Sequence, residues 1–333
     1  MRLEMIIHAI LFPICALSLI YKYYTSTGPH IIEIKDPKFS ILGPYNTTQI
    51  LVEDNYTQLI DINNFTFKMN PQPCKNNLAG LLLVIIVSSS PGNQEKRMAI
   101  RHTWGQNRDW IKAVFLIGET ENVTVAQNIT KESMLYDDIV QGNFVDAYRN
   151  MTYKHVMGLK WVAHHCPTAK YVLKTDDDIM VSTREMALFL ARELSPWGTK
   201  DLITCQLSPI TEVHRTESKW MVTPEEYPFP FYPPFCEGWA VIYSQDVVPR
   251  LLKAVQNTPF FWIDDAFITG IIAAQIGVKR TQLSSFVMDE IELNKWKWLR
   301  PNSNKTLVFV ILLDRLSIAS SASSRYLADP SHI

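Results

Sequence analysis

Apolar runs that end in small or polar residues recur along the chain from about residue 78 onward. The first of these, LAGLLLVIIVSSS (78–90), is continuously apolar up to its serines. This pattern predicts a buried parallel strand whose carboxyl end opens into a loop. Shorter runs predict further strands at AVFLIG (113–118), KYVLKT (170–175), DLITCQ (201–206) and WAVIYS (239–244).

Longer mixed segments between these runs have the composition of helices. Residues 93–105 carry Arg97 and Arg101 one turn apart, and residues 146–166 read as an amphipathic helix. A third helix is expected from Asp264, with Gly277 as its stop. Alternating strands and helices predict an α/β fold with a mostly parallel central sheet. In such folds, ligands gather at the carboxyl ends of the strands.

The chain before this region divides into an apolar and a polar part. Residues 5–21, MIIHAILFPICALSLIY, form a mostly apolar run flanked by Arg2 and Lys22. We predict a signal-anchor transmembrane helix there, with residues 1–4 as a cytoplasmic tail, while a cleaved signal peptide remains the alternative. Residues 22–75 contain prolines and little periodicity, and they predict a lumenal stem before a folded domain at 76–333.

Composition supports a globular protein of the secretory route. Hydrophobic residues make up 47% of the 333 positions, and the net charge of −1 argues against a nucleic-acid partner. Five cysteines include Cys15 inside the apolar run, which leaves an even number for two disulfides in three alternative pairings. Structural zinc is the alternative role for these cysteines, but the chain has no C-x-x-C or His-x-x-x-His spacing to support it. Acceptor sites for N-glycans occur at Asn46, Asn55, Asn64, Asn122, Asn128, Asn150 and Asn304.

Three consecutive aspartates follow the apolar run 170–175. Side chains two apart on an extended segment share a face, so Asp176 and Asp178 are expected to converge while Asp177 points away. Converging carboxylates at a strand end suit Mg²⁺ or Mn²⁺. The alternative is a solvated acidic turn that caps the next helix through Asp178.

In this context the chain resembles the β-1,3-glycosyltransferase family, which includes β-1,3-galactosyltransferases and β-1,3-N-acetylglucosaminyltransferases. Similar segments occur in the family order over about residues 78–277: RMAIRHTWG, VFLIG, ESMLYDDIVQGNFVDAYRNMT, KTDDD, YPFPFYPPFCEGWAVIYS and IDDAFITG. The resemblance implies a GT-A fold, a Rossmann-like domain that binds a UDP-sugar with Mn²⁺. It also implies a type II Golgi membrane protein with a lumenal catalytic domain, which acts on a glycoprotein or glycolipid glycan.

Several residues take expected roles from this resemblance. Asp178 is the favoured metal ligand, and Asp176 contacts the metal, its water or the ribose; Asp177 has the weakest claim. Asp265 matches the catalytic carboxylate that deprotonates the acceptor hydroxyl, with Asp264 as the alternative base. Further donor contacts are expected from Ser88, Arg97, Arg101, Glu237 and Gly238, although the two arginines could instead pin the first loop.

The chain also departs from the family pattern. Asp264-Asp265-Ala266 replaces Glu-Asp-Val, Gly270 lies one residue later than usual, and Glu237 and Trp239 flank Gly238. These departures leave open a catalytically weak or inactive relative that binds UDP or glycans. The donor could be galactose or an N-acetylhexosamine, and a homodimer is one option for the assembly.

Overall fold

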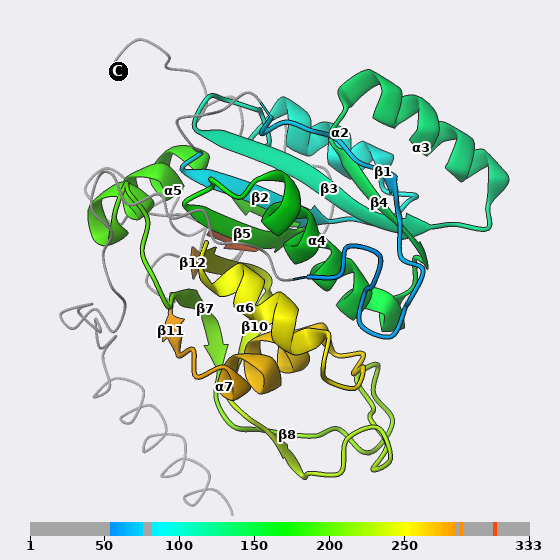
Figure 1. The fold of residues 1–333 in the computed structure, drawn as a ribbon, viewed down its shortest axis with the longest axis vertical. Helices are drawn as coiled ribbons and strands as arrows, with labels where there is room; N and C mark the ends of the chain where they lie inside the picture. The colour runs from blue at the N-terminus through cyan, green and yellow to red at the C-terminus, as the bar shows by residue number, and fades with distance from the viewer. Residues whose placement is uncertain (1–53, 76–80, 284–286, 289–308, 312–333) are drawn as a thin grey trace, which may run out of the picture. The chain divides into compact units, whose positions relative to one another are not determined.

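The computed structural model describes residues 54–75, 81–283, 287–288 and 309–311. Within them, an eight-stranded sheet has the order β1-β4-β3-β2-β5-β10-β7-β11 (Figure 1). The strands are β1 (Phe67–Met69), β2 (Leu83–Ser88), β3 (Ile111–Glu119), β4 (Ile139–Val145), β5 (Tyr171–Asp176), β6 (Ile179–Val181), β7 (Ile203–Ser208), β8 (Thr211–Glu212), β9 (Phe231–Tyr232), β10 (Phe235–Ser244), β11 (Arg280–Gln282), β12 (Val287–Met288) and β13 (Phe309–Ile311). Each predicted strand run lies on one of these strands.

The centre of the sheet is parallel and its flanks are mixed. Strand β2 is buried along its whole length and runs parallel to both β3 and β5. Strand β10 runs antiparallel to β5 and β7, and β1 runs antiparallel to β4. The expectation of a mostly parallel α/β sheet is therefore confirmed for the core of the fold.

Helices cover both faces of this sheet. They are α2 (Gln94–His102), α3 (Val123–Tyr136), η1 (Tyr148–Asn150), α4 (Met151–His165), α5 (Thr183–Phe189), η2 (Leu190–Leu194), α6 (Val247–Val255), η3 (Asp265–Ile272) and α7 (Ala273–Gln275). Helix α4 packs closely on β2 and β3, because Gly158 leaves room for Leu116 and Ile86. Helix α3 packs through Ile129 with Ile117 in a separate apolar cluster.

Helix α4 was predicted to be amphipathic, and this is wrong. All residues from Lys154 to Ala163 are buried, because the helix packs both on the sheet and against α6. Its buried polar groups find partners inside the protein. The Lys154 ammonium, for example, donates to the Ser89 carbonyl at 2.7 Å and to Asp146 at 3.0 Å.

Residues 54–75 fall in the predicted stem, yet they belong to the folded domain. Strand β1 adds an edge to the main sheet through β4, and Leu59 and Phe65 are buried in the core. A disulfide joins Cys74 to Cys166 at the end of α4. The low periodicity of this segment reflects a chain that follows the edge of the sheet. The remainder of the stem and the predicted anchor at 5–21 lie outside the described residues.

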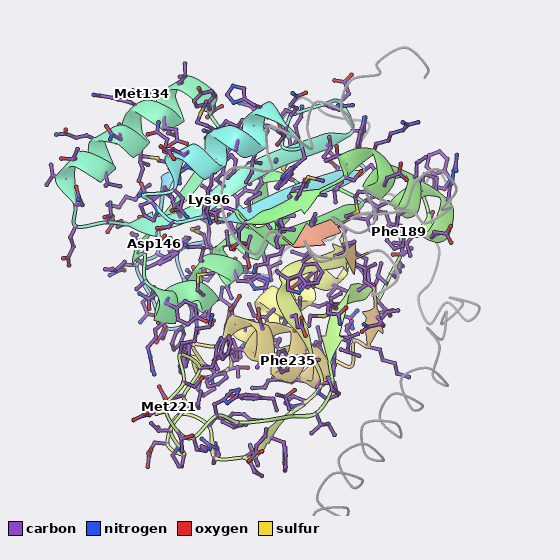
Figure 2. The ribbon with its side chains drawn as sticks, turned by 180° about the vertical axis from the view of Figure 1, so that it is seen from behind. Lys96, Met134, Asp146, Phe189, Met221 and Phe235 are labelled. Carbon is purple, nitrogen blue, oxygen red and sulfur yellow. A yellow bond between two sulfur atoms is a disulfide. The ribbon has the colours of Figure 1, made fainter. Side chains whose placement is uncertain are left out.

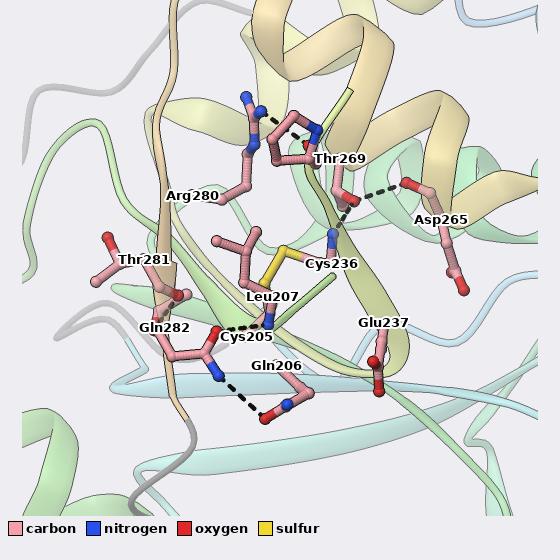
Figure 3. The surroundings of a disulfide bond; sticks show 12 residues. Cys205, Gln206, Leu207, Cys236, Glu237, Asp265, Thr269, Arg280, Thr281 and Gln282 are labelled. Atoms are coloured by element: carbon pink, nitrogen blue, oxygen red, sulfur yellow. Dashed lines mark hydrogen bonds between the residues drawn. A yellow bond between two sulfur atoms is a disulfide. The ribbon is translucent and has the colours of Figure 1, made fainter. Parts of the chain in front are cut away.

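The second disulfide joins Cys205 of β7 to Cys236 of β10. Figure 3 shows its surroundings, where the Thr269 hydroxyl accepts from the Cys236 amide and donates to the Asp265 carbonyl. This contact fastens η3 to the start of β10. The two disulfides use all four cysteines outside the apolar run, as predicted.

The helix expected from Asp264 is present, but its first part is a π-helix. Residues 265–272 form η3, α7 follows, and Gly277 ends the segment with a φ of 72°. A π-helix takes more residues per turn than an α-helix, so it accommodates the longer spacing before Gly270. In the described part of the chain, we found no helix of the length and apolarity that a bilayer crossing requires.

Candidate active site

The three aspartates follow the central strand of the sheet, and each has a different environment. Strand β5 ends at Asp176, while Asp177 and Asp178 form the turn to β6. We call residues 176–178 the aspartate turn. Asp177 accepts hydrogen bonds from Ser89 at 2.8 Å, Asn93 at 2.8 Å and Lys96 at 2.9 Å. Figure 2 labels Lys96 on α2. Asp177 therefore ties β5 to the loop after β2, and its carboxylate is already occupied by protein groups.

Asp178 is the exposed member of the three. Desolvation of its carboxyl group and the charges of Asp176 and Asp177 raise its pKa, although Lys96 opposes this shift. Helix α5 begins after Ser182, so Asp178 does not cap it. The alternative of an acidic capping turn is therefore not found.

Asp176 is held by a buried lysine from the same strand. The Lys174 ammonium donates to Asp176 Oδ1 at 2.8 Å and to the Gly238 carbonyl at 2.5 Å. Burial disfavours the charge on Lys174, but the carboxylates of Asp176, Asp264 and Asp265 outweigh burial and raise its pKa. Lys174 thus stays charged and connects the aspartate turn to strand β10.

Gly238 in turn contacts the predicted base. Its amide donates to Asp265 Oδ2 at 3.0 Å. A Cβ atom at position 238 would lie 1.9 Å from Asp265 Oδ1, so only glycine permits this approach. One short path, Asp176–Lys174–Gly238–Asp265, therefore joins the two acidic clusters, which are 89 residues apart in sequence if counted from Asp176 to Asp265.

The two acidic residues at the start of η3, Asp264 and Asp265, have pKa values shifted in opposite directions. His155 Nδ1 lies 3.0 Å from Asp264 Oδ2, and His155 Nε2 lies 3.0 Å from the Tyr243 hydroxyl. Burial would raise the pKa of Asp264, but the hydrogen bond from His155 and the charge of Lys174 hold it below its usual value. Asp264 is therefore ionised, and its Oδ2 atom is engaged by His155.

Asp265 has the opposite electrostatic setting. Burial and the neighbouring charge of Asp264 raise its pKa well above the usual carboxyl value, against the effect of Lys174. Its Oδ1 atom is buried and has no hydrogen-bond partner among the described residues. A carboxylate with a raised pKa and an unpartnered oxygen is suited to accept a proton. Of the two candidates for the base, Asp265 is the one with such an oxygen.

The residues also fit a divalent cation. The described part of the chain holds no group of three or more His, Cys, Asp or Glu side chains arranged to bind a metal. Mg²⁺ and Mn²⁺ bound with nucleotides commonly take one or two carboxylates and complete their shell with phosphate oxygens and water. Asp176 and the exposed Asp178, whose charges repel one another, supply that donor set.

Among the predicted donor contacts, the two arginines have structural partners. The buried Arg97 uses its guanidinium on Glu132, Ser89 and the Ser90 and Pro91 carbonyls. Arg101 pairs with Glu132 and Asp138, both at 2.7 Å. Arg97 therefore pins the first loop, whereas Arg101 ties α2 to Glu132 of α3 and to Asp138.

The other predicted donor contacts, Ser88, Glu237 and Gly238, lie near the end of β5. Ser88 pairs in register with Asp176, and its buried hydroxyl has no partner among the described residues. Glu237 accepts from the Trp239 indole at 3.2 Å, next to Gly238. An unpartnered hydroxyl beside Asp176 is compatible with a contact to a bound nucleotide.

Lys174, His155 and Tyr243 are site residues that motif reasoning missed. A lysine that follows the apolar residues 171–173 and stands two residues before the first of three aspartates was a usable signal for Lys174. No comparable signal existed for His155 and Tyr243, because their partners are remote in sequence.

The predicted glycan acceptors occupy varied positions. Asn55, Asn64, Asn122 and Asn128 are exposed, whereas Asn150 is half-buried at the end of η1. Asn46 and Asn304 lie outside the described residues. The exposed positions are accessible to modification.

Comparison with known proteins shows the family of the chain. The family model described as Galactosyltransferase matches residues 95–284, which is more than half of the chain. The chain therefore belongs to the β-1,3-glycosyltransferase family, and it is similar to β-1,3-galactosyltransferases.

The relatives found by sequence are about one-third identical to this chain, whereas the solved structures found by fold comparison are only distantly similar. Beta-1,3-galactosyltransferase 1 of Homo sapiens is 32% identical over 246 residues, 72% of each chain. Beta-1,3-galactosyltransferase 5 of Pan troglodytes is 33% identical over 208 residues, 61% of this chain and 69% of the relative. A solved glycosyltransferase involved in glycosylation of the PBCV-1 major capsid covers 74% of this chain and 99% of its own, at 8% identity and a TM-score of 0.38. A score this low indicates only a distant similarity.

Proposed function

We propose that the protein is an inverting glycosyltransferase that moves a hexose from a UDP-sugar to a hydroxyl of a glycan acceptor and forms a β-1,3 bond. Galactose is the first donor sugar to test, because the relatives are named β-1,3-galactosyltransferases. N-acetylhexosamines remain the other donors of this proposal.

One observation carries the proposal more than any other. The contact path from Asp176 through Lys174 and Gly238 places Asp265 beside the end of β5. A donor diphosphate held at the aspartate turn would therefore present its sugar near a basic carboxylate. This arrangement supports transfer to an acceptor in a single displacement, which is what inversion requires.

In this proposal, Asp265 removes the proton of the acceptor hydroxyl. An acceptor hydroxyl is a weak nucleophile until a neighbouring base takes its proton. The unpartnered Oδ1 of Asp265 takes that proton, while the Gly238 amide holds Oδ2 in place. Asp264, kept ionised by His155 and Lys174, maintains the basicity of Asp265.

Asp178 and Asp176 would hold Mn²⁺, with the Ser88 hydroxyl available to the nucleotide. When bound, Mn²⁺ would stabilise the negative charge that develops on the departing UDP. For this reason we propose Mn²⁺ as the cofactor.

We also propose that the protein acts in the Golgi lumen as a single-pass type II membrane protein. The apolar run 5–21 and the exposed glycan acceptors support this location. The acceptor would then be a glycoprotein or glycolipid glycan.

The proposal is tested by measuring UDP release from UDP-galactose, UDP-N-acetylglucosamine and UDP-N-acetylgalactosamine. The full-length chain is assayed with a panel of acceptor glycosides, with Mn²⁺ and with EDTA. We expect acceptor-dependent release with one donor, and we expect EDTA to abolish it. Release that needs no acceptor would indicate a hydrolase, and no release with any donor would contradict the proposal.

A further inference from the structure

Three segments that are distant in sequence meet beside the start of η3. Arg149 of η1 pairs with Glu226 at 2.6 Å, and its guanidinium lies 4.4 Å from the Trp262 ring. The Thr152 hydroxyl at the start of α4 donates to the Phe261 carbonyl at 2.7 Å. Segments 148–152, 220–227 and 261–264 therefore form one surface, adjacent to the residues that carry the proposed base.

Two aromatic side chains of this surface remain open to solvent. Tyr148 is 53% exposed and Trp220 is 44% exposed. The Trp220 side chain acts on the Tyr148 hydroxyl and lowers its pKa. The Tyr148 ring also lies 6.1 Å from that of Trp262. Met221, labelled in Figure 2, marks the loop that carries Trp220.

Tyr148 also lies within the electrostatic field of the carboxylates of the site. Burial raises the pKa of Tyr148, the Trp220 side chain lowers it, and the charges of Asp265, Asp264 and Asp176 raise it further. Residues 261–264, which this surface includes, directly precede Asp265 in the chain. The surface therefore lies next to the proposed base.

The chemistry of this surface matches a sugar ring. A pyranose has an apolar face of C–H groups and a rim of hydroxyls, so aromatic faces and charged hydrogen-bonding groups recognise it together. Tyr148 and Trp220 supply exposed aromatic surface, and the partly exposed Arg149 and Glu226 supply polar groups beside it. Exposed aromatic side chains gathered around a reactive group commonly mark a ligand site.

We infer that Tyr148 and Trp220 form the subsite that binds the terminal sugar of the acceptor and presents its hydroxyl to Asp265. This inference rests on the proposed function. Both aromatic residues act by binding the acceptor, and neither takes part in proton transfer. The donor sugar is a less suitable occupant, because its diphosphate belongs at the aspartate turn.

The test compares steady-state kinetics of the purified full-length chain and its variants Trp220→Ala and Tyr148→Ala. Acceptor KM and donor KM are measured separately, with the donor that the wild-type protein uses. The acceptor probes are p-nitrophenyl β-galactoside, N-acetyl-β-glucosaminide and N-acetyl-α-galactosaminide. We expect each variant to raise the acceptor KM about tenfold, as for loss of one favourable aromatic contact, while the donor KM changes less than twofold.

Trp197→Ala is the matched control, because Trp197 is 47% exposed but follows the distant helix η2. It should leave both KM values at the wild-type level. Trp220→Phe and Tyr148→Phe retain an aromatic ring and guard against a folding defect; they should recover most of the acceptor affinity. An unchanged acceptor KM in both alanine variants, or an increase in donor KM alone, would overturn the inference and leave the proposed function standing. A wild-type protein that transfers no sugar would instead contradict the proposed function.

Discussion

Replacement of Gly238 by alanine tests the geometry of the proposed base with a single methyl group. The added Cβ would lie 1.9 Å from Oδ1, 2.5 Å from Cγ and 2.7 Å from Oδ2 of Asp265. The carboxylate would have to move by roughly 1.5 Å, and misplacement of about 1 Å can cost on the order of a hundredfold in rate. A hundredfold loss corresponds to about 2.7 kcal/mol of transition-state stabilisation.

The cost to folding should be smaller than the cost to catalysis. The atoms in the way belong to a side-chain carboxylate that can rotate, so we expect the free energy of unfolding to fall by at most about 1–3 kcal/mol. The assay therefore pairs kcat and donor KM with a thermal unfolding curve. We expect Gly238→Ala to remain folded, to bind the donor and to lose most of its turnover.

Gly92→Ala provides the matched control, because no atom lies within 4 Å of a Cβ at position 92. This variant should retain wild-type turnover and stability. If Gly238→Ala also keeps its turnover, Asp265 does not act from the position described above. A variant that unfolds outright would show that the contact is mainly structural.

Three further predictions follow from the electrostatics and the cross-links. Because Asp265 must be deprotonated to act and its pKa is raised, turnover should rise with pH along a limb that lies above the usual carboxyl range; a kcat profile that stays flat down to about pH 4 would contradict this. Glu132→Gln should lower the free energy of unfolding by about 3–5 kcal/mol, because it leaves the buried Arg97 without its anion. Burial acts to raise the pKa of Glu132, but its hydrogen bonds and ion pairs with the two arginines lower it. The stability that these contacts give the wild-type protein should therefore be present above the unfolded pKa and be lost as pH falls through the folded pKa, whereas the variant should lack this acid loss in denaturant titrations. Replacing both Cys74 and Cys166 by alanine should cost about 2–5 kcal/mol in the same titrations, and an unchanged midpoint would show that the cross-link does not constrain the chain.

Local pattern was sufficient to predict the central strands and the position of the aspartates. Strand β2 is an uninterrupted apolar run because both of its faces are covered, and this is visible in sequence. Asp176 is the last residue of β5, so its place at a strand end was also predictable. These features depend only on residues that are neighbours in the chain.

Features that depend on remote partners were not predictable in this way. For Arg97 and Arg101 the sequence left two roles open, contact with the diphosphate or pinning of the first loop, because Glu132, their shared partner on α3, is more than 30 residues away. Residues 54–75 lack periodicity because they pack along the sheet edge rather than form a regular element, so they resembled a stem. The contact between Gly238 and Asp265 likewise requires β10 and η3 to be placed together first.

The most direct measurement compares wild-type protein with Asp265→Asn in donor binding and in acceptor-dependent UDP release, both with Mn²⁺. This substitution keeps the size of the side chain and removes its ability to take a proton. We predict that Asp265→Asn binds the UDP-sugar with wild-type Kd and releases UDP at least about a hundredfold more slowly. Wild-type turnover by Asp265→Asn would contradict the central claim that this carboxylate and the aspartate turn act on one bound sugar nucleotide.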